Sequence, residues 1–211
     1  IADFNTIFNL CTTLVMFPIC PALVKLSAKV LKDNEEESLT ERELKRLDPT
    51  FLNTPVIALE QVRSVISAMA KTCIENHEIA SSLFENYDEK LIQKLEENEA
   101  FLDKAETSVG DYLALVNRRS LSNEMASVAR EASLAVCDFE RIGDYAINVM
   151  EVSQYQKDHK DVFSEECKEE LSILNKAISR ILNLTDKAYS ENIAHYSSQV
   201  EPLEETIDEI I

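Results

Sequence analysis

The chain has 211 residues, of which 45% are hydrophobic and 28% are charged, and it contains only 2 glycines and 5 prolines. This composition leaves little turn-forming sequence and is typical of long amphipathic helices, so an all-α fold is expected. The formal net charge is −18, which argues against a nucleic-acid partner, because contacts to phosphates need clustered Lys and Arg.

The first 32 residues differ in charge from the rest. They hold one acid, Asp3, and three lysines, which leaves 18 bases and 38 acids, a net charge of −20, for the remainder. The chain begins at Ile1 and ends at Ile211 within a periodic apolar pattern. We therefore expect a fragment of a longer protein.

The N-terminal apolar run "FNTIFNLCTTLVMFPICPALV", residues 4–24, contains 21 residues without a charge. That length spans the hydrocarbon core of a bilayer, and the lysines that follow at 25, 29 and 32 fit the positive-inside rule. Residues 1–32 are therefore predicted to hold a transmembrane helix, with everything after about residue 25 on the cytoplasmic side. A buried or interfacial helix, or a signal peptide, are the alternatives, and the last lacks the usual basic residues before the apolar run.

A charged, turn-prone linker is predicted for residues 33–54, and Pro55 fits the first turn of a helix. After it, apolar or small residues recur at alternating spacings of three and four, which is the pattern of packed helices. We call each such row of apolar positions along one helix face a seam. The first seam contains Leu59, Val62, Ile66, Met69, Cys73, Ala80 and Leu83, with Asn76 as its polar exception.

Similar seams predict three helices, at residues 55–85, 88–117 and 121–157, joined by short connections and so antiparallel. The domain at 55–157 is thus expected to be a three-helix bundle. Residues 160–211 predict one helix at about 163–193 and another from 194, a second bundle that is incomplete. Such a fragment exposes apolar seam, so self-association into a homo-oligomer is expected.

Acidic residues four apart border the predicted seams in three places. The pairs are Glu99 with Asp103, Glu140 with Asp144, and Glu204 with Asp208, and Asn148 and Glu151 extend the second pair along its helix. Like charges at this spacing repel on a helix, and partial burial adds to the penalty unless a cation compensates. If the second and third helices are antiparallel neighbours, the first two pairs converge, as in carboxylate metal sites of helical bundles. Iron, zinc, manganese or magnesium would suit such ligands, and the sequence does not identify the metal.

Gly143 lies inside the sequence "FERIGDYAINVME", where a helical glycine costs about 1 kcal/mol relative to alanine. Two explanations remain open: a backbone that a ligand must approach, or a tight contact between helices.

No catalytic site is predicted. His77, His159 and His195 are not spaced as a group, and the chain has no nucleophile motif and no glycine-rich phosphate loop. Five scattered cysteines (Cys11, Cys20, Cys73, Cys137 and Cys167) form neither a C-x-x-C pair nor a zinc motif. They are expected to be reduced, small apolar residues of a cytosolic compartment.

The motif "FERIGDYAINVME" resembles the E-R-I-G-D-x-A-x-N-x-x-E signature of PhoU-like domains. The segments "LDPTFLNTPVIALEQVRSVISAMA" and "IADFNTIFNLCTTLVMFPICPALVKL" are similar to the PhoU-like tail and the last transmembrane helix of sodium/phosphate cotransporters, with Asn5 where His is usual in that family. The resemblance implies a phosphate importer of the inner (plasma) membrane. Its transport domain, with the sodium and phosphate sites, would precede residue 1.

The same resemblance implies a cytoplasmic regulatory tail of two bundles with E/D-x-x-x-D metal motifs. The pairs at Glu99 and Glu140 would belong to the first bundle and the pair at Glu204 to the second. A free-standing PhoU-like regulator of phosphate uptake and a metal-free helical adaptor are the competing hypotheses.

Overall fold

The structure is a computed structural model that describes residues 38–191 and 194–210. The described residues form helices and no strands, as the composition predicts. The predicted transmembrane segment within residues 1–32 lies outside them. Within the described residues, no helix combines the length and the apolarity that a bilayer crossing requires.

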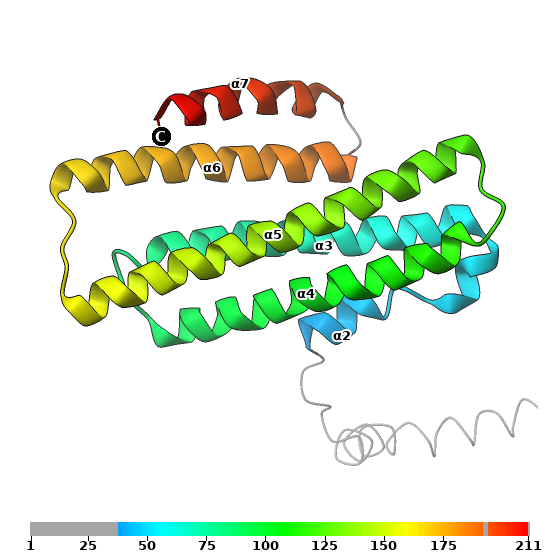
Figure 1. The fold of residues 1–211 in the computed structure, drawn as a ribbon, viewed down its shortest axis with the longest axis horizontal. Helices are drawn as coiled ribbons and strands as arrows, with labels where there is room; N and C mark the ends of the chain where they lie inside the picture. Colours follow the sequence, from blue (N-terminus) through cyan, green and yellow to red (C-terminus); the bar gives the residue numbers. More distant parts are fainter. Residues whose placement is uncertain (1–37, 192–193, 211) are drawn as a thin grey trace, which may run out of the picture. The chain divides into compact units, whose positions relative to one another are not determined.

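Three long helices form the bundle: α3 (Pro55–Ser82), α4 (Glu89–Asn117) and α5 (Asn123–His159). Each packs against the other two, and short connections make successive helices antiparallel (Figure 1). The bounds predicted from the seams are confirmed to within about three residues. The small differences lie at the helix ends, which apolar periodicity locates less well than the helix itself.

Local sequence explains where these helices begin and end. Pro55 occupies the first turn of α3, where no backbone N–H is needed. The side chains of Asp88 and Ser122 accept hydrogen bonds from the backbone N–H of Lys90 and Met125 and so cap α4 and α5. Lys160, in the left-handed conformation with φ 57°, ends α5.

The segment predicted as a linker is partly folded onto the bundle. It contains α2 (Leu39–Leu44) and the 3-10 helix η1 (Pro49–Asn53), and Leu52 joins the main core. The Tyr112 hydroxyl of α4 lies 2.9 Å from the Asp48 carbonyl oxygen and so ties this segment to the bundle. The linker prediction thus needs correction from residue 39 onward, where tertiary contacts order a segment of weak periodicity.

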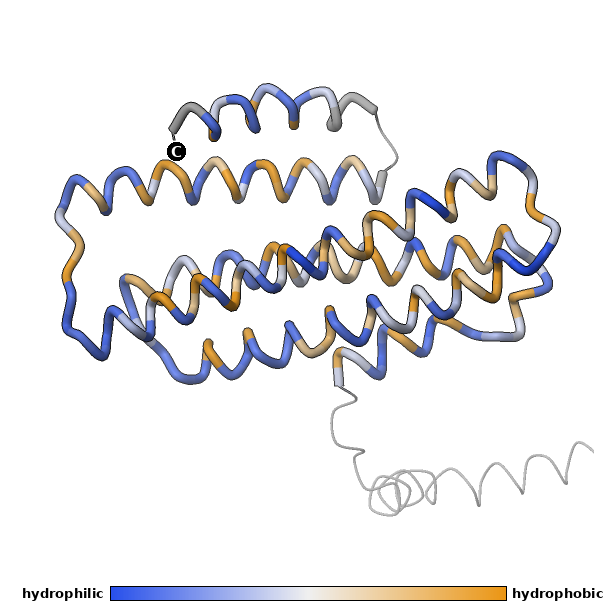
Figure 2. The backbone as a smooth tube through the Cα atoms, in the orientation of Figure 1, coloured by the Kyte–Doolittle hydropathy of each residue, from blue (hydrophilic) through white to orange (hydrophobic). Residues whose placement is uncertain are grey.

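The two C-terminal helices are α6 (Glu165–Glu191) and α7 (Ala194–Ile210), close to their predicted positions. Within the described residues, α6 packs against α3 and α7, and α7 packs against α6 alone. Figure 2 shows apolar and polar residues alternating along both helices. Whether they belong to a second bundle stays a prediction.

The core of the three-helix bundle has two parts. The larger cluster consists mainly of buried apolar residues of α3 up to Cys73, of α4 from Phe101 onward and of α5 up to Phe139. The smaller cluster begins at Ile79 on α3 and at Ala146 on α5, and its α4 members are Ile92 and Leu95. The bundle therefore has a break in its apolar core near the middle of all three helices.

Two buried asparagines occupy this break. Asn76 of α3 and Asn98 of α4 are 0% and 1% exposed, and the Asn98 Nδ2 atom donates to Asn76 Oδ1 over 2.8 Å. Asn98 Nδ2 also lies 2.9 Å from Glu75 Oε2, whereas Asn76 Nδ2 and Asn98 Oδ1 have no protein partner. Such a pair disfavours other registers of α3 against α4, because any shift would bury an unpaired amide.

Gly143 of α5 is buried at the same level, and it contacts α4 closely. A Cβ atom at this position would overlap Cδ1 of Leu102, a side chain that is itself only 1% exposed. The explanation by tight helix contact, left open by the sequence, is therefore supported. Gly110 of α4 offers a contrast, since a Cβ there would meet no atom within 4 Å.

Gly143→Ala is expected to lower the free energy of unfolding by about 1 kcal/mol. Overpacking against Leu102 costs about 1–3 kcal/mol and outweighs the gain of about 1 kcal/mol in helix propensity. The matched control, Gly110→Ala, should raise the free energy of unfolding by about 0.5–1 kcal/mol. Urea unfolding followed by circular dichroism measures both, and equal stabilisation by the two alanines would contradict the tight contact.

Candidate metal centre

Three carboxylates from two helices meet on the outer side of the α4–α5 contact. Glu99, Asp103 and Asp144 each offer one oxygen, and these oxygens all lie within 4.8 Å of one another. Glu140 is close enough to Asp103 and Asp144 for their charges to influence its ionisation. We call Glu99, Asp103, Glu140 and Asp144 the carboxylate cluster.

The contact between Leu102 and Gly143 explains why these side chains meet. Asp103 directly follows Leu102, and Asp144 directly follows Gly143, so the close approach of the two helices carries both aspartates with it. Glu99 and Glu140 lie four residues before them, one turn back along each helix, on the same helical faces. The convergence predicted from an antiparallel arrangement is thus present.

The electrostatics of the cluster are unfavourable in the absence of a cation. Partial burial, followed by the charges of Asp103 and Asp144, raises the pKa of Glu99 above its ordinary value. Partial burial, followed by the charges of Asp144, Glu106 and Asp103, likewise raises the pKa of Glu140, and Arg141 offsets this only in part. No salt bridge found in the described part of the chain involves any of the four carboxylates.

Two side chains that were not predicted as site residues, Glu106 and Cys137, adjoin the carboxylate cluster. Glu106 lies three residues after Asp103, and it accepts a hydrogen bond from the thiol of Cys137, which raises the pKa of that thiol. Cys137 itself is exposed and three residues before Glu140. The spacing of three that marks the same helix face would have identified both residues.

The cysteine prediction holds for one of the described cysteines. Cys73 is buried in the core, and burial raises the pKa of its thiol to about 12. Cys137 is exposed and Cys167 is half-buried, so these two are not core residues as predicted. All three thiols are free.

The remaining predicted ligands are not part of this group. Asn148 and Glu151 are exposed on α5, one and two turns beyond Asp144. Glu204 and Asp208 are exposed on α7, and α7 touches only α6 among the described helices. A metal site at either place stays a prediction.

A scan against protein-family models matches the PhoU domain to residues 66–153. Residues 66–153 are a PhoU domain. The match contains most of α3, all of α4 and α5 up to Ser153, and therefore the whole carboxylate cluster. The curated proteins and the solved structures gave no match. The findings thus support the PhoU-like part of the resemblance and a helical protein of the phosphate-uptake regulator type, whereas they give no support to the sodium/phosphate cotransporter part.

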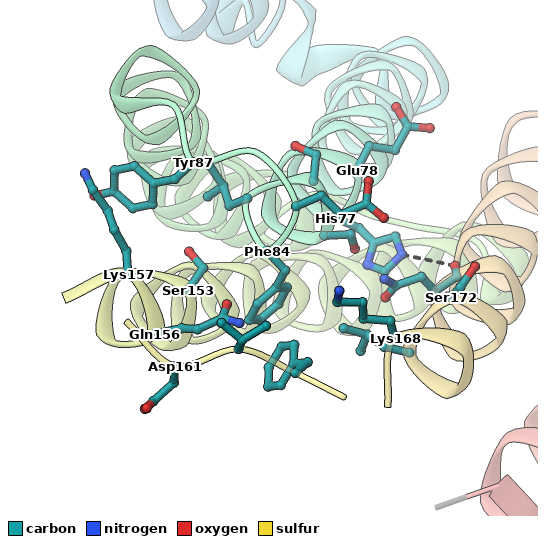
Figure 3. A pocket seen from close by; sticks show the side chains of 18 of the residues that line it. His77, Glu78, Phe84, Tyr87, Ser153, Gln156, Lys157, Asp161, Lys168 and Ser172 are labelled. Carbon is teal, nitrogen blue, oxygen red and sulfur yellow. Dashed lines mark hydrogen bonds between the residues drawn. The ribbon is translucent and has the colours of Figure 1, made fainter. Parts of the chain in front are cut away.

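A separate cavity of about 1050 Å³ lies beside the end of the PhoU domain, between α3, α5 and α6 (Figure 3). His77 forms part of its wall, with Nε2 3.3 Å from the Asn175 carbonyl oxygen, and burial lowers the pKa of this imidazole. Phe84, Tyr87 and Lys157 also line it, and the Lys157 amine lies over the Tyr87 ring, 3.5 Å from its centroid. No member of the carboxylate cluster lines the cavity, so the two features are independent.

The raised pKa of Glu99 makes a prediction about stability and pH. Because the folded-state pKa lies above the unfolded one, the penalty from the ionised group is absent at low pH and fully present above the folded pKa. In chelator-treated protein, Glu99→Gln should therefore raise the free energy of unfolding at pH 7 by a few tenths of a kcal/mol. This gain should vanish near pH 3.5, below the ordinary range of glutamate.

Chemical unfolding of both proteins across this pH range checks the prediction. The matched control is Glu97→Gln, which neutralises an exposed glutamate of the same helix that is not a member of the carboxylate cluster. A gain of the same size at low pH, or the same gain in the control, would contradict the repulsion.

Proposed function

We propose that this chain is a regulatory module of phosphate uptake whose PhoU domain binds a metal ion at the carboxylate cluster. The observation that carries the proposal is the gathering of Glu99, Asp103 and Asp144 from two helices inside the matched PhoU domain. The role is regulatory and not catalytic.

The donor set fits a hard or carboxylate-tolerant cation. All the gathered ligands are oxygens of acidic side chains, and their mutual repulsion is relieved only slightly by Arg141. Glu99, Asp103 and Asp144 would hold the ion, with Glu140 completing the set. Iron, zinc, manganese and magnesium all accept such ligands. A bound cation would supply the positive charge that the cluster lacks and so would join α4 to α5.

The double variant Asp103→Asn with Asp144→Asn tests metal binding. It should be more stable than the parent without metal and less stable than the parent with metal. Without metal, the variant should unfold at slightly higher temperature than the parent, because a like-charge repulsion of a few tenths of a kcal/mol is gone. With metal at about 100 times its dissociation constant, the parent should gain about 2.7 kcal/mol, and the variant should not. Its affinity should fall by roughly 100-fold or more, since even outer-shell changes lower affinity 10–100-fold.

The measurement is thermal unfolding and calorimetric titration of the 211-residue chain with Mn²⁺, Mg²⁺, Zn²⁺ and Fe²⁺ after chelator treatment. The matched control is Asp111→Asn with Asp158→Asn, which removes one exposed aspartate from each of the same two helices. No metal-dependent gain in the parent, for any of the four ions, would leave a metal-free helical adaptor as the better description.

A more specific form of the proposal makes the module the cytoplasmic tail of a sodium-dependent phosphate transporter. The uncharged segment at residues 4–24, followed by lysines, favours it. In that case the upstream transport domain would handle sodium and phosphate at the inner (plasma) membrane. The tail would follow on the cytoplasmic side, and tails of neighbouring copies would associate. A free-standing regulator is the alternative, and the domain match fits it slightly better.

Cell fractionation separates these two forms. The intact protein, expressed with residues 1–32, should appear in the membrane fraction and should resist extraction by alkaline carbonate if it is a transporter tail. A variant in which Leu14→Lys and Val15→Lys interrupt the apolar run should lose this behaviour. Recovery of the unmodified protein wholly in the soluble fraction would contradict the transporter form and leave the regulator.

A further inference from the structure

We propose that a groove between α2, α3 and the start of α4 binds a phosphate group, either free phosphate or the phosphate of a small ester. The groove has a volume of about 720 Å³ and lies on a different face of the bundle from the carboxylate cluster, with which it shares no residue. Five basic side chains line it: Arg42, Arg46, Arg63, Lys71 and Lys94. We call it the basic groove.

Its charge is opposite to that of the surrounding protein. Three acids line the groove, Glu43, Glu60 and Glu75, so five bases minus three acids give a net charge of +2. Residues 38–211 as a whole carry 18 bases and 34 acids, a net charge of −16. A positive groove in so acidic a unit attracts small anions and favours them over cations.

A buried carboxylate holds two of the arginines in place. Glu43 is 6% exposed, and its two oxygens accept hydrogen bonds from Arg42 Nε over 3.0 Å and Arg46 Nε over 2.7 Å. Both arginines use Nε for this contact, which leaves their terminal Nη groups for other acceptors. The two side chains are 61% and 49% exposed, so a solute can reach them.

The groove also presents hydroxyl donors beside these guanidinium groups. Arg46 Nη1 lies 3.2 Å from Ser64 Oγ, and Ser67 lines the same wall of α3. Lys71, one turn beyond Ser67, is exposed. Arg63 has a different role, since its Nη2 atom donates to the Tyr189 carbonyl oxygen over 2.7 Å and so joins α3 to α6.

This set of donors matches the chemistry of a phosphate group. Guanidinium forks bind phosphate and carboxylate oxygens in pairs, and hydroxyl groups supply further donors to an ion that only accepts. A phosphate group carries about −1.5 to −2 charges at pH 7, which balances the net +2 of the groove, whereas a monocarboxylate leaves it positive. The fixed arginines lose little freedom on binding, which favours affinity.

Calorimetric titration of the 211-residue chain tests the proposal. The protein is treated with chelator first, so that no metal at the carboxylate cluster contributes, and the ionic strength is held constant with NaCl. Sodium phosphate, glycerol 3-phosphate and sodium acetate are the three probes. One equivalent of phosphate or of the ester should bind saturably, and acetate should bind at least about tenfold more weakly.

The main variant is Arg42→Gln with Lys71→Gln, which should weaken phosphate binding by about tenfold or more. Arg46 is left in place, because its removal would strip Glu43 of its closest partner. Lys71→Glu serves as a second variant, since no ion pair or hydrogen bond of Lys71 is found in the part of the chain that the structure describes. The matched control, Lys104→Gln with Arg118→Gln, removes two exposed bases outside the groove and should bind as the parent does.

Binding of glycerol 3-phosphate but not of phosphate would identify a phosphorylated small molecule as the occupant. Absence of saturable binding by both, equal affinity for acetate, or an equal loss in the control variant would overturn the proposal. These outcomes do not depend on metal binding, so the basic groove and the carboxylate cluster can fail separately.

Discussion

The close approach of α4 and α5 at Leu102 and Gly143 is the constraint on which the site depends. An apolar contact in the core and a gathering of charges at the surface arise from the same few residues, because each contact residue is followed directly by an aspartate. Packing draws the helices together, while the carboxylates push them apart. The fold tolerates the repulsion because the acids remain partly solvated, where like charges cost only tenths of a kcal/mol. Burial of the Leu102 side chain against Gly143 stabilises the fold by considerably more than this repulsion costs.

The helices of this fold could be predicted because apolar spacing, proline positions and capping residues agree along the whole of residues 55–191. Residues 39–53 could not, since their order comes from contacts distant in sequence. Leu52 enters a core built by α3, α4 and α5, and Asp48 meets Tyr112 of α4. A short charged segment with one or two apolar anchors has no periodicity to read, and its structure becomes evident only when the surface that it covers is known.

The carboxylate cluster was predictable to a similar extent. Spacing places Glu99 with Asp103 and Glu140 with Asp144, and antiparallel packing of neighbouring helices brings the two pairs together. Glu106 was missed because only acidic residues four positions apart were considered, and Glu106 lies three positions after Asp103. The basic groove was missed for another reason: its arginines and lysines come from α2 and the turn after it, from α3 and from α4, and only the folding of α2 onto the bundle makes them neighbours.

The buried asparagine pair bears on how such a bundle can move. Asn76 and Asn98 bond to each other across α3 and α4 in the gap between two apolar clusters. Axial sliding by one helical turn would set each amide against the apolar residues that flank the pair, at a cost of about 1–3 kcal/mol for every unpaired group. Splaying of α5 would leave this pair intact, but it would open both apolar clusters and break the buried hydrogen bond from Cys73 Sγ to the Phe139 carbonyl oxygen. The asparagine pair therefore fixes how far α3 and α4 can slip along one another, and a change of state in this domain is expected to keep their register.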